Sequence, residues 1–359
     1  MKTSLTAAII VALASAPALA QPTPGPAATA TARAALEREQ ASGVLAALDE
    51  ALGTYVFPEK AAQARRVLNA NRARYLTIAD REALATRLTA DIGAALDDKH
   101  FYVRASASAR AAGVRVDPAL AEAEIGYGID AVRRLPGNIG YIDLRQFGNS
   151  EESARRIEAA MDLLQDTQAL IIDLRNNRGG GGVAMAALIG RLASQPIPRS
   201  ALLWRQADGS FERVEGETTD YPAEKRYGRP VYLLTANFTI SAGEGFAYDL
   251  QAAGRVTVVG ERSRGGANPM NRPVHDLGEG FVAWVSNGRS EHPVTKGTPN
   301  GTGVIPDVAT PPEQALSVAY RRALEGVAAT NPDSRFGREL ASAKADPEAS
   351  LAKSLAAAG

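Results

Sequence analysis

Apolar residues recur at helical spacing through the first part of the chain, across residues 33–98. A continuous apolar stripe is formed at every fourth position by Leu84, Leu88, Ile92 and Leu96. Pro58 precedes a glutamate and a lysine, and proline is typical of the first position of a helix. The pattern predicts a helical bundle as the N-terminal domain, residues 33–100, with His100 just beyond its last helix.

From residue 139 the pattern changes to strands and helices in alternation. Amphipathic segments predict helices at residues 151–166 and 183–192. A strand, a helix and a strand of these lengths imply parallel strands joined by right-handed crossovers, so the predicted fold class is α/β. The short apolar runs that predict the strands are residues 139–144, 169–174, 231–235, 256–260 and 281–285.

The remaining segments are less regular. Asp208-Gly209, between two apolar segments, predicts a β-hairpin within residues 195–230, which we interpret as an insertion or a lid. A helix over residues 312–328 closes the α/β domain, whose limits we place at residues 101–330. An Ala-rich tail, residues 331–359, follows it.

The first 20 residues have the pattern of a signal peptide. Lys2 supplies the charge, a short apolar run follows, and Ala18-Leu19-Ala20 forms a small-residue cleavage site before Gln21. The alternative is a retained anchor, but the run is well short of the roughly 20 residues that span a bilayer. We therefore expect an exported protein, periplasmic or secreted and not membrane-spanning, with residues 21–32 as a flexible lead-in.

Composition narrows the class of function. Lys and Arg together number 40, as do Asp and Glu, so no excess charge recruits nucleic acid, and we expect no nucleic-acid partner. The chain has no cysteine, which excludes disulfides, thiolate catalysis and cysteine-ligated zinc. A hydrophobic content of 45% is enough for a buried core. We expect neither a cofactor nor a metal, and the oligomeric state is not specified.

The stretch from Thr239 to Glu244 holds the first candidate for chemistry. An apolar run ends at Thr235, and a helical pattern follows in which Phe246 and Leu250 are one turn apart. Ser241 therefore lies at a turn between a strand and a helix. Its hydroxyl is exposed there, and the first N–H groups of the helix point at whatever it attacks. We interpret Ser241 as a nucleophile.

A glycine run, Gly179 to Gly182, has three interpretations. It fits a loose dinucleotide-binding fingerprint, but no acidic residue follows the next strand at the required distance, and no Gly-Lys-Ser/Thr is present. It could equally be a tight turn without a ligand. The third interpretation is an oxyanion hole, because consecutive glycines let backbone N–H groups point at one oxygen.

His100 is the candidate base among three histidines, the others being His275 and His292. It follows a helix C-terminus, where the helix dipole favours the imidazolium form. A lone histidine is more often structural than catalytic, so the position alone does not decide its role.

Four motifs occur together in a fixed order: Asp173 to Gly180, Ser241 to Glu244, Gly260 to Ser263, and Gly303 to Asp307. With these motifs the chain resembles the C-terminal processing, or tail-specific, serine protease family, which includes the tricorn core protease and the interphotoreceptor retinoid-binding proteins. The N-terminal segments Tyr55 to Ala62 and Asp98 to His100 resemble the retinoid-binding branch. The resemblance implies a crotonase-like core of ββα units and cleavage of peptide or protein substrates.

The resemblance also implies roles for single residues. Ser241 aligns with the nucleophile, and the N–H groups of Ala242, Gly179 and Gly180 align with the oxyanion hole. Residues 101–138 are too few for the inserted domain that captures substrate tails, so processive tail recognition is not expected.

The base differs between branches of the family. Gly266 stands where the Ser-Lys branch has lysine, whereas His100 stands where the tricorn-like branch has its histidine. Asn300 occupies the third position, which is a glutamate in that branch; its amide oxygen can orient His100 but carries no charge. The sequence predicts a serine-type peptidase with Ser241, His100 and Asn300 as its catalytic group. The alternative is a non-catalytic carrier of an apolar ligand or a peptide on the same fold.

Overall fold

The computed structural model describes residues 36–105, 118–271, 274–329 and 331–357. The predicted signal peptide and lead-in lie outside these residues. The described residues from Leu36 onward form one compact unit.

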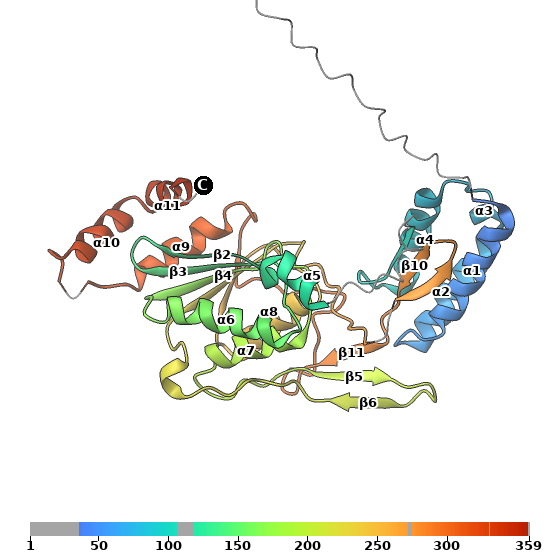
Figure 1. The fold of residues 1–359 in the computed structure, drawn as a ribbon, viewed down its shortest axis with the longest axis horizontal. Coiled ribbons are helices and arrows are strands. Elements are labelled where there is room, and N and C mark those ends of the chain that lie inside the picture. The colour runs from blue at the N-terminus through green and yellow to red at the C-terminus, as the bar shows by residue number, and fades with distance from the viewer. Residues whose placement is uncertain (1–35, 106–117, 272–273, 330, 358–359) are drawn as a thin grey trace, which may run out of the picture. The chain divides into compact units, whose positions relative to one another are not determined.

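Within the described residues, this unit begins with the helices α1 to α4 and ends with α9 to α11, and the strands lie between them in sequence (Figure 1). The α-helices are α1 (Arg38–Leu52), α2 (Pro58–Ala70), α3 (Arg72–Tyr75), α4 (Arg81–Leu96), α5 (Pro118–Glu124), α6 (Glu151–Leu164), α7 (Gly182–Leu192), α8 (Ala242–Ala252), α9 (Ala315–Glu325), α10 (Arg335–Ala345) and α11 (Pro347–Ala356). The strands are β1 (Tyr102–Ala105), β2 (Ile129–Leu135), β3 (Ile139–Leu144), β4 (Ala169–Asp173), β5 (Ala201–Arg205), β6 (Phe211–Val214), β7 (Val231–Thr235), β8 (Thr257–Gly260), β9 (His275–Gly278), β10 (Phe281–Trp284), β11 (Gly288–Glu291) and β12 (Val308–Ala309).

A six-stranded mixed sheet forms the centre of the α/β part, in the order β12-β8-β7-β4-β3-β2. β3, β4, β7, β8 and β12 are parallel, and β2 pairs antiparallel with β3. The apolar runs at residues 139–144, 169–174 and 231–235 are therefore confirmed as neighbouring parallel strands. Their carboxyl ends lie at one edge of the sheet, which is the edge where loops of an open α/β sheet form binding sites.

Alternate residues of the strands enter two cores, because side chains of a strand point to opposite faces. Ile142, Ile172 and Leu233 belong to a core that includes residues of α6, α7 and α8. Ile171 and Leu234 belong to a second core with residues of α9, α10 and α11. In Figure 1, α6 and α7 lie below the strands, and α10 and α11 lie on the other side of them. The predicted Ala-rich tail is thus helical, and part of it packs against the sheet.

The N-terminal helices share their core with strands that come from elsewhere in the chain. The sheet of this part has the order β1-β10-β9, and all its pairs are antiparallel. Phe281 and Ala283 of β10 are buried in the same core as Leu88 and Ile92 of α4. The predicted helices are present, and a three-stranded sheet completes the bundle that we expected to be all-helical.

A third, small sheet has the order β11-β5-β6. β5 and β6 are antiparallel and joined through Asp208-Gly209, so the predicted hairpin is confirmed, with Gly209 at a φ of 87°. None of the helices in the described ranges combines the length and the apolar content that a transmembrane segment requires.

Candidate active site

Ser241 occupies a sharp turn between β7 and α8, as the sequence predicts. Its φ of 60° and ψ of −126° are disfavoured for a residue with a Cβ atom. Two contacts fix the backbone there: the Ser241 N–H donates to the Gly266 carbonyl at 3.1 Å and to Glu244 Oε2 at 3.1 Å. The half-buried serine is therefore held in a strained conformation at the start of a helix.

Glu244 connects this turn to the glycine-rich loop that follows β8. Its fully buried carboxylate accepts four hydrogen bonds, from the N–H groups of Ser241, Gly265 and Gly266 and from the Ser263 hydroxyl. Burial raises the pKa of Glu244, although the four donors favour the charged form. Its role is structural, because all its bonds go to the two loops that form the site.

The glycine loop lies directly against the serine. A Cβ atom built on Gly179 would come within 2.5 Å of Ser241 Cβ and 3.1 Å of the Ala242 nitrogen. Gly179 and Gly180 have φ values of 86° and 124°, which a side chain disfavours. Asn177 fixes the loop, because its Nδ2 donates to the Leu144 carbonyl at 2.8 Å.

The three predicted oxyanion donors differ in their availability. The Gly179 N–H donates to Asn177 Oδ1 at 2.9 Å, so this group is already used inside the loop. Within the described ranges, the N–H groups of Gly180 and Ala242 have no hydrogen-bond partner. The pair of free donors is therefore Gly180 and Ala242, and the expectation for Gly179 is corrected.

His100 lies four residues beyond the end of α4, which stops at Asp97 in a left-handed conformation. Its Nδ1 is 2.8 Å from the backbone carbonyl of Asn268. A carbonyl oxygen only accepts hydrogen bonds, so Nδ1 must carry the proton. The neutral ring then has its lone pair on Nε2, which is the form that a general base requires.

Gly266 brings the histidine and serine segments together. The Gly266 carbonyl accepts the Ser241 N–H. A Cβ atom built on Gly266 would come within 3.3 Å of the His100 backbone nitrogen and 3.0 Å of Ile240 Cδ1. This crowding leaves little room for the lysine of the Ser-Lys branch. In the part of the chain that the structure describes, no hydrogen bond joins the His100 ring to Ser241 directly.

Asn300 has a different partner from the one that the sequence predicts. Its Oδ1 accepts the backbone N–H groups of Ala267 and Asn268, at 3.0 and 3.1 Å. It does not bond to His100, because the Asn268 carbonyl already takes Nδ1. Asn300 therefore acts one step away from the histidine, on the loop that carries this carbonyl. Sequence reasoning missed Asn268, because a backbone acceptor has no signature in the residue type.

The other two histidines have structural surroundings. His292 is buried, and its ring contacts the Pro198 carbonyl and accepts the N–H groups of Val294 and Thr295. His275 Nε2 lies 3.3 Å from Thr54 Oγ1. Both of these histidines thus have partners away from Ser241, and the role of His100 as the base stays a prediction.

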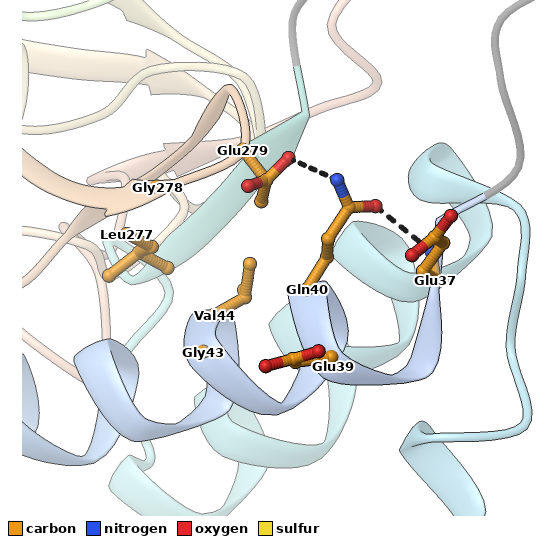
Figure 2. A pocket seen from close by; sticks show the side chains of 8 residues that line it. All are labelled: Glu37, Glu39, Gln40, Gly43, Val44, Leu277, Gly278 and Glu279. Carbon is orange, nitrogen blue, oxygen red and sulfur yellow. Dashed lines mark hydrogen bonds between the residues drawn. The ribbon is translucent and has the colours of Figure 1, made fainter.

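Two hollows bear on where a ligand could lie. The first, of about 450 Å³, lies between α1 and the β9–β10 turn, where Gln40 Nε2 donates to Glu279 at 2.9 Å (Figure 2). Its lining contains none of the predicted site residues. The second, of about 810 Å³, is lined by Arg178, next to Gly179, and by Phe238, which is 42% exposed and lies three residues before Ser241. The lining of the second hollow also contains none of the predicted site residues, but Arg178 and Phe238 are close in sequence to Gly179 and Ser241.

Two family models and a curated relative match this chain. The model of peptidase family S41 matches residues 138–310, and the model of the N-terminal domain of that peptidase in eukaryotic interphotoreceptor retinoid-binding protein matches residues 27–125. A carboxyl-terminal-processing protease of Synechocystis sp. is 30% identical over 182 residues, which cover 48% of this chain and 38% of that protein.

The fold is similar to that of solved structures. A crystal structure from Parabacteroides merdae matches with a TM-score of 0.51 at 18% identity, covering 74% of this chain and 90% of that one. The photosystem II D1 C-terminal processing protease matches with a TM-score of 0.45 at 17% identity, covering 77% and 93%. The first likeness supports the α/β fold alone.

Proposed function

This chain belongs to peptidase family S41, and from that premise we propose that it is a serine-type peptidase that uses Ser241 and His100. The observation that carries the proposal is the strained turn at Ser241, next to the partnerless N–H groups of Gly180 and Ala242. Strain of this kind is kept where the surrounding structure holds it for function. A crotonase-like core is part of the same proposal.

The proposed reaction has two halves. Ser241 Oγ attacks the carbonyl carbon of a peptide bond while His100 Nε2 takes the hydroxyl proton, and the proton then passes to the leaving amine. The N–H groups of Gly180 and Ala242 stabilise the oxyanion of the tetrahedral intermediate. Water, activated by the same imidazole, hydrolyses the acyl-enzyme and restores the hydroxyl.

The hollow beside Arg178 and Phe238 is the proposed place for the substrate chain. The guanidinium groups of Arg178 and Arg264 lie over the Phe238 ring, with centres 5.5 and 5.4 Å from it. Phe238 is 42% exposed, so an apolar surface lies next to two positive charges that its ring attracts. A peptide that reaches Ser241 would pass this surface.

Export and the domain limits remain proposals as well. We propose that residues 1–20 are removed during export. We also propose that residues 33–100 and 101–330 form the N-terminal and peptidase domains, except that β1, β9 and β10 belong to the core of the N-terminal helices. Sequencing the N-terminus of the protein recovered from the periplasm or the medium should give Gln21 as the first residue. A product that keeps Met1 would contradict the export proposal.

A non-catalytic carrier of an apolar ligand or peptide is the second candidate. The neutral residue at position 300 favours it, because a carbonyl and an amide supply no charge to stabilise an imidazolium ion. A carrier would keep the fold and the hollow but would not react with electrophiles.

Labelling with a fluorophosphonate probe separates the two candidates. We expect wild-type protein to be labelled between about pH 6 and pH 9 and Ser241→Ala to be unlabelled, since the probe requires an activated hydroxyl. Ser342→Ala, which changes an exposed serine on α10, is the matched control and should be labelled like the wild type. An unlabelled wild-type protein over this range would favour the carrier.

A further inference from the structure

We propose that Asp98 is the positioning residue of His100, because one buried carboxylate holds both ends of the hydrogen bond that fixes the imidazole. The inference rests on the proposed function of His100 as the general base. It assigns to Asp98 the orienting task that an acidic side chain in direct contact with the ring performs in a serine protease triad.

Asp98 is only 3% exposed and accepts three hydrogen bonds. Its Oδ1 accepts the backbone N–H of His100 at 2.8 Å. Its Oδ2 accepts Asn268 Nδ2 at 3.1 Å and the Tyr55 hydroxyl at 2.8 Å. The Asp98 carboxylate therefore contacts both partners of one hydrogen bond: His100, whose ring donates it, and Asn268, whose carbonyl accepts it.

The Asn268 carbonyl is held from several sides. It accepts His100 Nδ1 at 2.8 Å and the Ser286 hydroxyl at 3.2 Å, while the Asn268 N–H donates to Asn300 Oδ1. Since Asp98 also accepts Asn268 Nδ2, the carbonyl, the N–H and the side-chain nitrogen of Asn268 are all engaged. The carbonyl cannot rotate without breaking buried hydrogen bonds, which is costly.

In this arrangement the Asn268 carbonyl and the Asp98 carboxylate together orient the His100 ring, a task that a single carboxylate performs in a serine protease triad. The carbonyl keeps the proton on Nδ1 and so leaves the Nε2 lone pair available, and Asp98 keeps the carbonyl in place. Catalysis is sensitive to such placement, since a shift of about 1 Å can cost about 100-fold in rate. Asp98 thus acts on the reaction through His100 and Asn268 without touching the substrate.

Asp98→Asn tests whether the Asp98 carboxylate positions His100, with almost no change in the shape of the side chain. An amide has one acceptor oxygen and one NH₂ group, whereas His100 and Asn268 both donate to Asp98 through different oxygens. One of the two contacts must become a donor facing a donor. We expect kcat for a peptide substrate to fall between about 10- and 100-fold, with KM changed less than about threefold.

A spectroscopic measurement reads the position of the proton directly. The chain has three histidines, so long-range ¹H–¹⁵N NMR spectra of the imidazoles can be assigned with His100→Gln. The neutral ring of His100 in the wild type should be the Nδ1–H tautomer. Asp98→Asn should show a mixture of both tautomers, because the fixed acceptor is loosened.

Tyr55→Phe is the matched control. It removes one buried hydrogen bond of the same carboxylate but leaves both contacts to His100 and Asn268. We expect it to lose stability while keeping the wild-type kcat within about twofold and the Nδ1–H tautomer. Equal effects of Tyr55→Phe and Asp98→Asn on kcat and tautomer would reduce Asp98 to a packing role and overturn the proposal.

A second variant covers the case in which Asp98→Asn does not fold. Asn268→Ala keeps the backbone carbonyl but frees it from Asp98, so it should give the same loss of kcat and the same mixed tautomer. A single Nδ1–H tautomer with wild-type kcat in either variant overturns the proposal. A wild-type protein that neither cleaves peptides nor takes the fluorophosphonate probe contradicts the peptidase, and the tautomer then decides the role of Asp98 alone.

Discussion

Ser241 has a backbone conformation that a Cβ atom disfavours, and its neighbours explain how it is kept there. Its N–H has two acceptors, Gly266 and Glu244, and Gly179 approaches its side chain so closely that no other residue type fits at 179. A strained residue persists only where such contacts over-determine it. Relief of the strain is therefore measurable as stability.

Ser241→Gly and Ser241→Ala should differ in stability although both lack the hydroxyl. Glycine accepts a φ of 60° and ψ of −126° freely, whereas alanine keeps the Cβ atom. We expect the glycine variant to be more stable than the alanine variant by about 1 to 2 kcal/mol, after the entropy of the unfolded glycine is included. Urea denaturation measures the difference, and an alanine variant of equal or greater stability would show that the turn is unstrained.

The stability contribution of Glu244 should depend on pH. Burial raises the pKa of Glu244 above its ordinary value of 4.5, so the folded state keeps the proton in a range where the unfolded state has released it. The free energy of unfolding therefore falls as pH rises from about 4.5 through the raised pKa. Glu244→Gln does not titrate and lacks this fall, although it is less stable at every pH because it cannot accept four hydrogen bonds.

Urea denaturation of both proteins across this range tests the sign. The stability advantage of the wild type over Glu244→Gln should narrow as pH increases through the window. An advantage that stays constant or widens would mean that the four donors outweigh burial and that the pKa of Glu244 is not raised.

Several site residues were predictable because their positions follow from local patterns. Ser241 and Ala242 follow a strand and begin a helix, and Gly180 belongs to a glycine run after another strand of the same sheet. The partner of His100 was not predictable, because it is the backbone oxygen of Asn268. Asp98 is two residues before His100 in the sequence, but only the fold shows which atoms its carboxylate contacts.

Among the elements, the periodicity of apolar residues identified individual helices and strands, but it did not identify which distant strands pair with each other. The parallel strands β3, β4 and β7 are continuous apolar runs, so sequence alone located them. The pairing of β1 with β10 joins segments that are far apart in the sequence, and no local pattern specifies such a partner. For this reason the N-terminal part was expected to be all-helical.

The end of α4 is a second place where conformation and residue type disagree. Asp97 has φ of 49° and ψ of 47°, and this left-handed conformation favours glycine at the end of a helix. Asp97→Gly should raise the free energy of unfolding by about 0.5 kcal/mol or more and leave kcat unchanged within about twofold. Thermal denaturation and peptide cleavage measure the two effects.

The control for this variant is Lys60→Gln. Lys60 Nζ lies 3.5 Å from Asp97 Oδ2, so both variants lose the same ion pair. The pair is exposed, and exposed pairs contribute about 0 to 1 kcal/mol. A loss of stability in Asp97→Gly that is larger than the loss in Lys60→Gln would contradict the proposed strain.

At the scale of the whole molecule, the site depends on segments that belong to different cores. The segment at His100 adjoins the core of the N-terminal helices. Ser241 adjoins the core between the six-stranded sheet and α6, α7 and α8, which we call the core under the large sheet. Lys99 Nζ donates to the carbonyls of Arg264 and Gly301, at 2.7 and 3.3 Å. It therefore connects the segment of His100 to the loop after β8 and to the loop that carries Asn300. The relative position of base and nucleophile therefore depends on the N-terminal core as a unit.

Phe281→Ala tests this dependence from a position far from His100 in the sequence. Phe281 of β10 is fully buried in the core of the N-terminal helices, and Arg81 of α4 lies over its ring at 5.3 Å. Truncating a buried phenylalanine costs about 3 to 5 kcal/mol, mostly by leaving a cavity. We expect hydrogen exchange to accelerate in α1, α2 and α4, and kcat to fall, while exchange in β4 and β7 changes much less.

Ile157→Ala is the matched control, because Ile157 of α6 is buried to a similar degree in the core under the large sheet. It should accelerate exchange in α6 and β4 and spare the N-terminal helices. Since cavities in separate cores couple weakly, the two variants should give complementary maps of exchange. If both variants accelerate exchange equally everywhere, the cores unfold as one unit, and His100 owes its position to the whole chain and not to the N-terminal core.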